Sequence, residues 1–74
     1  MNVIDSDIIY QKVNLNTASQ EELITIPYIG EYTAQAIIQY RNQNGQFLSI
    51  DQVKKVKGIR DKNYAKFKKY LVAK

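Results

Sequence analysis

The chain reads SQEELITIPYIGEYTAQAIIQYR at residues 19–41, and thirty positions later it reads SIDQVKKVKGIRDKNYAKFKKYL at residues 49–71. Laying one copy over the other aligns Ser19 with Ser49, Leu23 with Val53, Ile26 with Val56, Ile29 with Ile59, Ile37 with Phe67, and Tyr40 with Tyr70. Each copy predicts a short helix, a tight turn and a longer helix. A duplicated unit of this size predicts an all-α fold, with four short helices in two antiparallel pairs related by a pseudo-two-fold axis.

Capping signals predict where the short helices begin. Ser19 and Glu22 form a capping box, in which a hydroxyl and a carboxylate would each bind a backbone N–H group. Ser49 and Gln52 repeat the pattern in the second copy. We therefore expect equivalent capping boxes at the start of both repeats.

Breaking residues and hydrophobic spacing predict the remaining helix bounds. Pro27 predicts that the first helix ends near residue 26, and Gly45 predicts the end of a second helix that starts after residue 30. The third and fourth helices are expected at about residues 50–56 and 61–71. Tyr64, Phe67 and Leu71 should face inward, opposite a stripe of Lys62, Lys66 and Lys69.

The flanking segments predict a single small domain. Residues 1–12 have no clean helical period and are expected to form a flexible leader, whereas residues 13–74 form the repeat domain. Residues 13–16 should form an extended segment, with Val13 and Leu15 able to pack on the helices after it. Phe47 and Leu48 are expected to fill the space between the repeats.

Composition excludes several kinds of chemistry. The chain has no cysteine and no histidine, so it lacks thiolate metal ligands, disulfides and the commonest general base. We expect no catalytic residue, no metal and no cofactor. The net charge is −4 over residues 1–53 and +8 over residues 54–74, and such concentrated positive charge is typical of polyanion binders, although a solvated lysine-rich helix is also common.

Both turns fall between a short helix and a longer one, at residues 27–30 and 57–60, and the pattern resembles the helix-hairpin-helix motif of DNA-binding proteins. Residues 13–23, 36–41 and 44–47 further resemble the DNA-binding domain of ComEA-type competence proteins, and the resemblance covers about residues 13–71. It implies sequence-independent binding of double-stranded DNA during DNA uptake in bacterial transformation, with other uptake proteins as further partners. It also implies an extracytoplasmic domain held by an N-terminal membrane anchor that this chain does not show. A chain that is complete as it stands would be cytoplasmic.

The motif binds phosphate for a physical reason. Turn glycines allow a close backbone approach, and N–H groups at the start of the following helix favour an anion. Backbone donors are expected from Ile29, Gly30, Ile59 and Arg60, side-chain donors from Thr33 and Asn63, and positive charge from Lys57, Arg60, Lys62 and Lys66. Gly58 is the turn glycine of the second DNA-binding hairpin.

Both turns depart from the family pattern. Tyr28 replaces the first glycine of the first hairpin, and a tyrosine at positive φ would cost about 1–2 kcal/mol, so we expect a different turn there. Arg60 replaces the second glycine of the second hairpin, where its guanidinium could grip a phosphate or its bulk could block approach. Glu31 lies where a phosphate would approach the first hairpin. One interpretation is that only the second hairpin binds.

Other functions stay open. Lys62 has the offset of the nucleophilic lysine in related glycosylases, but the chain has no acidic residue after Asp61. Tyr28 and Tyr32, at or just after the turn, are the tyrosines that could stack on single strands. Alternatively, the chain is a protein-interaction or assembly domain that retains the fold without binding DNA. A third possibility is an accessory domain of a larger nuclease or helicase.

Overall fold

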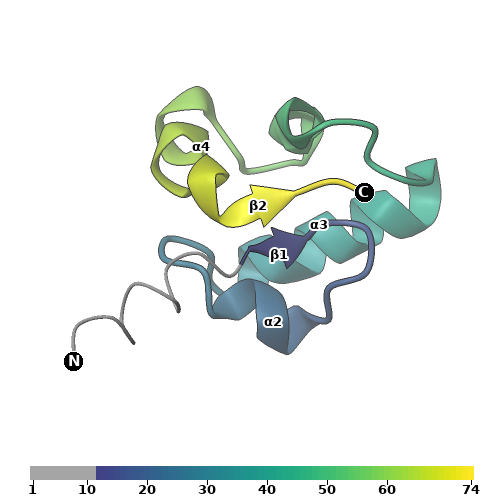
Figure 1. Ribbon diagram of the computed structural model, residues 1–74, viewed down its shortest axis with the longest axis horizontal. Coiled ribbons are helices and arrows are strands. Elements are labelled where there is room, and N and C mark those ends of the chain that lie inside the picture. Colours follow the sequence, from purple (N-terminus) through teal and green to yellow (C-terminus); the bar gives the residue numbers. More distant parts are fainter. Residues whose placement is uncertain (1–11) are drawn as a thin grey trace.

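Two helical units, one from each repeat, form the structure, which is a computed structural model that describes residues 12–74 (Figure 1). The first unit contains the α-helices α2 (Gln20–Ile24) and α3 (Glu31–Asn44). The second contains the 3₁₀-helix η1 (Ile50–Lys55), the α-helix α4 (Asp61–Phe67) and the 3₁₀-helix η2 (Lys68–Tyr70). The predicted all-α tandem fold is confirmed. Of the expected leader, only the exposed Lys12 lies within the described residues.

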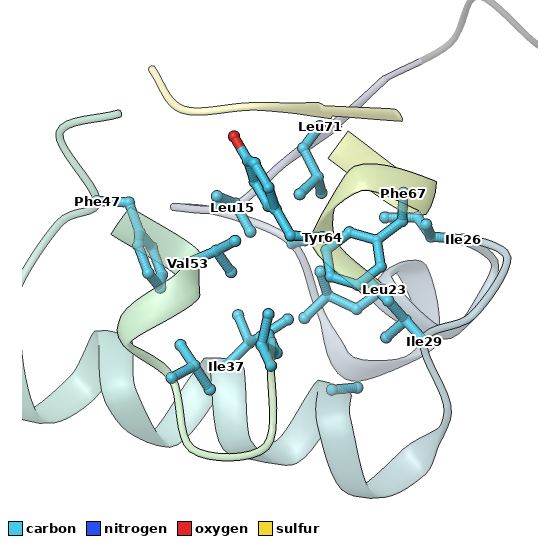
Figure 2. Packing of buried hydrophobic residues seen from close by; sticks show 14 residues of the cluster. Leu15, Leu23, Ile26, Ile29, Ile37, Phe47, Val53, Tyr64, Phe67 and Leu71 are labelled. Atoms are coloured by element: carbon cyan, nitrogen blue, oxygen red, sulfur yellow. The ribbon is translucent and has the colours of Figure 1, made fainter. Parts of the chain in front are cut away.

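A single hydrophobic core joins the two units, and the repeat determines its composition. Figure 2 shows side chains from both repeats gathered in one cluster. Five pairs of positions thirty residues apart are buried in both copies: Leu23 and Val53, Ile26 and Val56, Ile29 and Ile59, Ala34 and Tyr64, and Ile37 and Phe67. Since each unit buries its apolar face against the other, neither copy has a complete core of its own.

The two ends of the domain meet in a short parallel pair of strands. β1 (Val13–Asn14) pairs with β2 (Leu71–Val72), and the two lie side by side in Figure 1. The side-chain amide of Asn16 donates to the carbonyl oxygens of Phe47 and Lys74, each at 3.0 Å. The extended segment at residues 13–16 is therefore part of the fold, and it connects both termini of the domain to the loop between the repeats.

The two short helices begin differently. Ser19 caps α2 with both bonds of the predicted box, since its hydroxyl accepts from Glu22 N–H at 3.1 Å and the Glu22 carboxylate accepts from Ser19 N–H at 2.8 Å. The second box is absent: the Ser49 side chain makes no capping bond, and Gln52 accepts instead from the N–H of Leu48. The second short helix is a 3₁₀-helix, and its Gln52 side chain binds the N–H of the residue before Ser49, whereas a capping box requires the N–H of Ser49 itself.

Two further expectations are corrected in the second repeat. The helix predicted over residues 61–71 ends at Phe67, because the following 3₁₀ turn directs Leu71 into the strand pair. Phe47 is buried as predicted, whereas Leu48 is 82% exposed and fills no space in the core. Tyr64, Phe67 and Leu71 face inward as predicted.

The first hairpin adopts the turn that was expected to be excluded. Tyr28 has φ 74°, and its equivalent Gly58 has φ 93°. The expectation of a different turn is therefore wrong. Burial of Ile26 and Ile29 on either side of Tyr28 fixes the path of the chain, and the backbone of Tyr28 takes the left-handed conformation that this path requires.

Within residues 12–74, no helix has both the length and the apolar character needed to cross a membrane.

Gly58→Ala should destabilise the protein by about 1–2 kcal/mol, because Gly58 has φ 93° and an alanine there would be strained. Gly30→Ala is the matched control. Gly30 has φ −98° and no heavy atom within 4 Å of an added β-carbon, so we expect a much smaller change. Urea unfolding followed by circular dichroism measures both variants. Equal losses would contradict this account of the two turns.

A second prediction concerns Tyr64, whose hydroxyl donates to the Asp51 carboxylate and joins α4 to η1. Burial, the hydrogen bond to Asp51 and the negative charge of Asp51 raise the pKa of Tyr64 from 10.0 to about 12. The folded state therefore holds this proton more tightly than the unfolded state does. The stabilisation should be complete below about pH 10 and lost as pH rises towards about 12.

Tyr64→Phe removes the titrating hydroxyl, so the free energy of unfolding should depend less steeply on pH in this variant between about pH 10 and pH 12. Unfolding in urea at a series of alkaline pH values compares the two proteins. Parallel pH profiles would show that Tyr64 does not contribute in this way.

Candidate nucleic-acid interface

The two hairpin turns use part of their backbone hydrogen bonding internally. Ile29 N–H donates to the carbonyl oxygen of Ile26, and Ile59 N–H donates to that of Val56, each at 3.1 Å. Both isoleucine side chains are buried. The expectation that Ile29 and Ile59 offer backbone donors to a ligand is therefore wrong, because their N–H groups close the turns and their side chains hold the turns to the core.

The unpaired backbone donors begin one residue after each isoleucine, at Gly30 and Arg60. The first bonds of the long helices run from Ala34 N–H to Gly30 and from Tyr64 N–H to Arg60, each at 2.9 Å. The N–H groups of residues 30–33 and 60–63 thus precede the helical ladders and have no acceptor among residues 12–74. Gly30 and Arg60 were expected to donate and lie among these groups, whereas the donors at residues 31–33 and 61–63 were not predicted from the sequence. The rule that a helix leaves its first N–H groups unpaired would have located them.

The motif's second glycine position is occupied by Gly30 in the first turn and by Arg60 in the second. The two residues differ in how closely they let a ligand approach the backbone. Gly30 is exposed, and its backbone conformation is one that any residue can adopt. Its missing β-carbon leaves open space on the outer side, so the fold itself does not require glycine there. Arg60 occupies the equivalent position with φ −115° and no backbone strain. An arginine here presents a guanidinium beside the unpaired N–H groups.

Positive charge surrounds the second turn. All the predicted charged and polar residues of this repeat are exposed: Lys57, Arg60, Lys62, Asn63 and Lys66. Thr33, the counterpart of Asn63 in the first repeat, is half-buried. The structure therefore presents the cations of hairpin two to solvent, next to the N–H groups of residues 60–63.

Each hairpin also has one acidic residue at the start of its long helix. Asp61 lies 3.7 Å from the Nζ atom of Lys54, which offsets part of its negative charge. No cation of the described residues forms such a pair with Glu31. The first hairpin is therefore less favourable for an anion than the second.

The two turns each contact the long helix of the other repeat. Lys66 Nζ lies 5.0 Å from the ring centroid of Tyr28, and Tyr32 lies close enough to Gly58 that an added β-carbon would be 3.5 Å from Cε2 of the ring. Tyr28 and Tyr32 are about two-thirds exposed, at 65% and 66%. The hairpins and these two tyrosines thus form one continuous surface.

A hollow of about 390 Å³ adjoins this surface between α3 and the second turn. Its lining includes Tyr32, Gln35, Gln39 and Lys57. The glutamines were not among the predicted site residues, because no motif in the sequence distinguishes them from other exposed helix residues. A larger hollow of about 730 Å³ lies beside β1 and α2, and none of the predicted site residues lines it.

Comparison with known proteins places the chain in a family. The model of the helix-hairpin-helix motif matches residues 9–72. The chain belongs to the helix-hairpin-helix family. It is 45% identical over 62 residues to ComE operon protein 1 of Bacillus subtilis (strain 168), a match that covers 84% of the chain and 30% of that protein. The predicted resemblance to ComEA-type domains is confirmed.

Other relatives match the chain over part of their length. The chain is 37% identical over 49 residues to the endonuclease/exonuclease/phosphatase family domain-containing protein 1 of Xenopus laevis, covering 66% of the chain and 9% of that protein. It is 38% identical over 53 residues to an uncharacterized protein of Haemophilus influenzae, covering 70% of the chain and 47% of that protein. The chain thus spans less than half the length of each of these relatives.

Hydrogen exchange should distinguish the two kinds of turn N–H. We expect the amides of Ile29 and Ile59 to exchange at least about tenfold more slowly than those of Glu31 and Lys62, after correction for intrinsic rates, because only the isoleucine amides are hydrogen-bonded. Exchange into D₂O followed by NMR measures each amide. Similar protection of all four would contradict the assignment of the unpaired donors.

Proposed function

We propose that the chain is a non-enzymatic module that binds double-stranded DNA without sequence preference. The observation that carries the proposal is the row of unpaired N–H groups at residues 60–63, set among the exposed cations of the second hairpin. Phosphate contacts fix a protein on DNA but do not identify bases. A site made of backbone donors and cations therefore favours binding that is independent of sequence.

The second hairpin makes most of the contacts in this proposal. Lys57, Arg60, Lys62 and Lys66 supply charge, while Gly58 allows the turn and Asn63 adds a side-chain donor. Gly30 and Thr33 provide a weaker second contact, because Glu31 and the scarcity of cations disfavour phosphate at the first hairpin. Binding should be weak and strongly dependent on salt, since few phosphates are contacted.

The relationship to ComE operon protein 1 supports a role in DNA uptake during bacterial competence. We place the domain outside the cytoplasmic membrane, as the resemblance to ComEA implies, with other DNA-uptake proteins as further partners. In this role the module would hold incoming duplex DNA and leave any chemistry to other proteins.

A purely structural or protein-binding role is the second candidate. Leu48 is 82% exposed in the loop between the repeats, and such an apolar side chain could contact a protein partner. The match to a protein named for its endonuclease/exonuclease/phosphatase domain also supports a role as an accessory module of a larger enzyme. Neither alternative explains the net charge of +8 on residues 54–74.

A double charge reversal tests the proposal against these alternatives. Arg60→Glu with Lys62→Glu should weaken binding to blunt duplex DNA by about tenfold or more and lower the salt slope of log K by about 2, because two phosphate contacts are lost. Fluorescence anisotropy at several salt concentrations measures both quantities. Circular dichroism verifies that the variant remains folded.

Lys12→Glu with Lys74→Glu is the matched control. Both lysines are exposed and lie at the ends of the described chain, so the control changes the net charge equally but leaves the second hairpin intact. We expect a much smaller loss of affinity. If the unaltered protein fails to bind duplex DNA at low salt, or if both variants lose the same affinity, the proposal is wrong.

A further inference from the structure

The hollow between α3 and the second turn differs in character from the cationic surface beside it. Tyr32, Gln35, Gln39 and Gln43 follow one another along α3, and Lys57 closes the hollow from the second hairpin. Tyr32 and the three glutamines are exposed. Except for Lys57, the lining is uncharged, and it combines two tyrosine rings, Tyr32 and the half-buried Tyr40, with the glutamine amides.

The repeat provides a comparison within the same molecule. The positions on α4 and η2 equivalent to Tyr32, Ala36 and Gln39 are occupied by Lys62, Lys66 and Lys69. One copy therefore presents three cations suited to phosphate, and the other presents an aromatic ring, a methyl group and an amide at the corresponding places. The two hairpins have the same backbone turn, so the difference between the two surfaces comes from their side chains.

We propose that this hollow binds an unpaired nucleotide that extends from duplex DNA held on the hairpins. This inference rests on the proposed function and adds a preference for duplex DNA with a single-stranded extension. The Tyr32 ring stacks on the base, and Lys57 contacts its phosphate. Gln35 and Gln39 hydrogen-bond to the edge of the base.

The chemistry of the lining suits any of the four bases. Every base has a flat face that can stack on an aromatic ring. A glutamine side chain has both a donor and an acceptor, so it can bind different base edges without demanding one sequence. A volume of about 390 Å³ lies within the usual range of small-molecule sites. A base inside a duplex is already stacked and paired, so only an unpaired nucleotide presents its face and edge.

The position of the hollow connects it to the duplex site. Lys57 belongs both to its lining and to the cations of the second hairpin. The Tyr32 ring lies beside the turn, since a β-carbon added at Gly58 would be 3.5 Å from its Cε2 atom. The hollow therefore lies next to the second hairpin. A DNA strand whose phosphates bind this hairpin can place its next nucleotide in the hollow.

Equilibrium binding to two DNAs tests the inference. One is a duplex with a short single-stranded extension, and the other is a blunt duplex with the same total number of phosphates, so that charge alone gives no preference. We expect roughly fivefold to tenfold tighter binding of the extended DNA, as one stacked base would provide. A 2-aminopurine at the first unpaired position should lose fluorescence on binding if it stacks on Tyr32.

Variants in the lining assign the preference to this hollow. Gln35→Ala with Gln39→Ala should reduce the preference while leaving binding to blunt duplex DNA unchanged. Asn42→Ala is the matched control, because Asn42 is an exposed amide on α3 outside the lining of this hollow. Tyr32→Phe should retain the ratio of the two affinities, whereas Tyr32→Ala should bring it close to one.

The outcomes separate the two proposals. No binding of blunt duplex DNA at low salt would overturn the proposed function. Binding of blunt duplex DNA with no preference for the extension would overturn only the present inference. A preference that survives in the double glutamine variant would also overturn it, because the unpaired nucleotide would then lie elsewhere.

Discussion

The shared core between the two repeats is the constraint on which the rest of the structure depends. Equivalent positions from both copies are buried together, including Ile29 and Ile59 directly after the exposed turn residues. Each hairpin is therefore held by apolar residues on both sides and by one internal hydrogen bond. The turn conformation follows from this anchoring, which explains why Tyr28 adopts positive φ in the place where its equivalent is glycine. Packing outweighs a local backbone cost of about 1–2 kcal/mol.

Much of the fold could be predicted because the same sequence pattern occurs twice in the chain. The buried positions, the capping box at Ser19 and the end of α3 at Gly45 all follow from local signals in the sequence. The second repeat was harder to predict where long-range contacts decide the structure. Pairing of Leu71 with Val13 ends the last helix early, and this contact joins residues 58 positions apart. The Asp51 carboxylate likewise accepts from the Tyr64 hydroxyl, and this contact joins residues 13 positions apart.

The candidate site was predictable to a similar extent. Charge and motif located the second hairpin, and its cations are exposed as a binding surface requires. The donors expected at Gly30 and Arg60 lie among the unpaired N–H groups, whereas the residue before each of them was wrongly expected to donate to a ligand. In the structure that residue faces the core, as the burial of Ile29 and Ile59 shows. The amide-lined hollow could not be predicted, since it depends on how the second turn meets α3.

Glycine is favoured at the two glycine positions of the hairpin for different physical reasons. The two repeats distinguish these reasons, because each repeat has lost a different glycine. At the first position, φ is positive in both hairpins, so glycine relieves strain and tyrosine bears it. At the second position, φ is ordinary in both, and an added β-carbon at Gly30 meets nothing in the protein. A glycine there serves only what approaches from outside. Arg60 can therefore replace this glycine without cost to the fold. Its side chain makes close approach to the backbone harder, but it presents a guanidinium to the ligand. The repeat thus determines the shared fold, and the substitutions at these two positions determine how differently its two halves bind a phosphate.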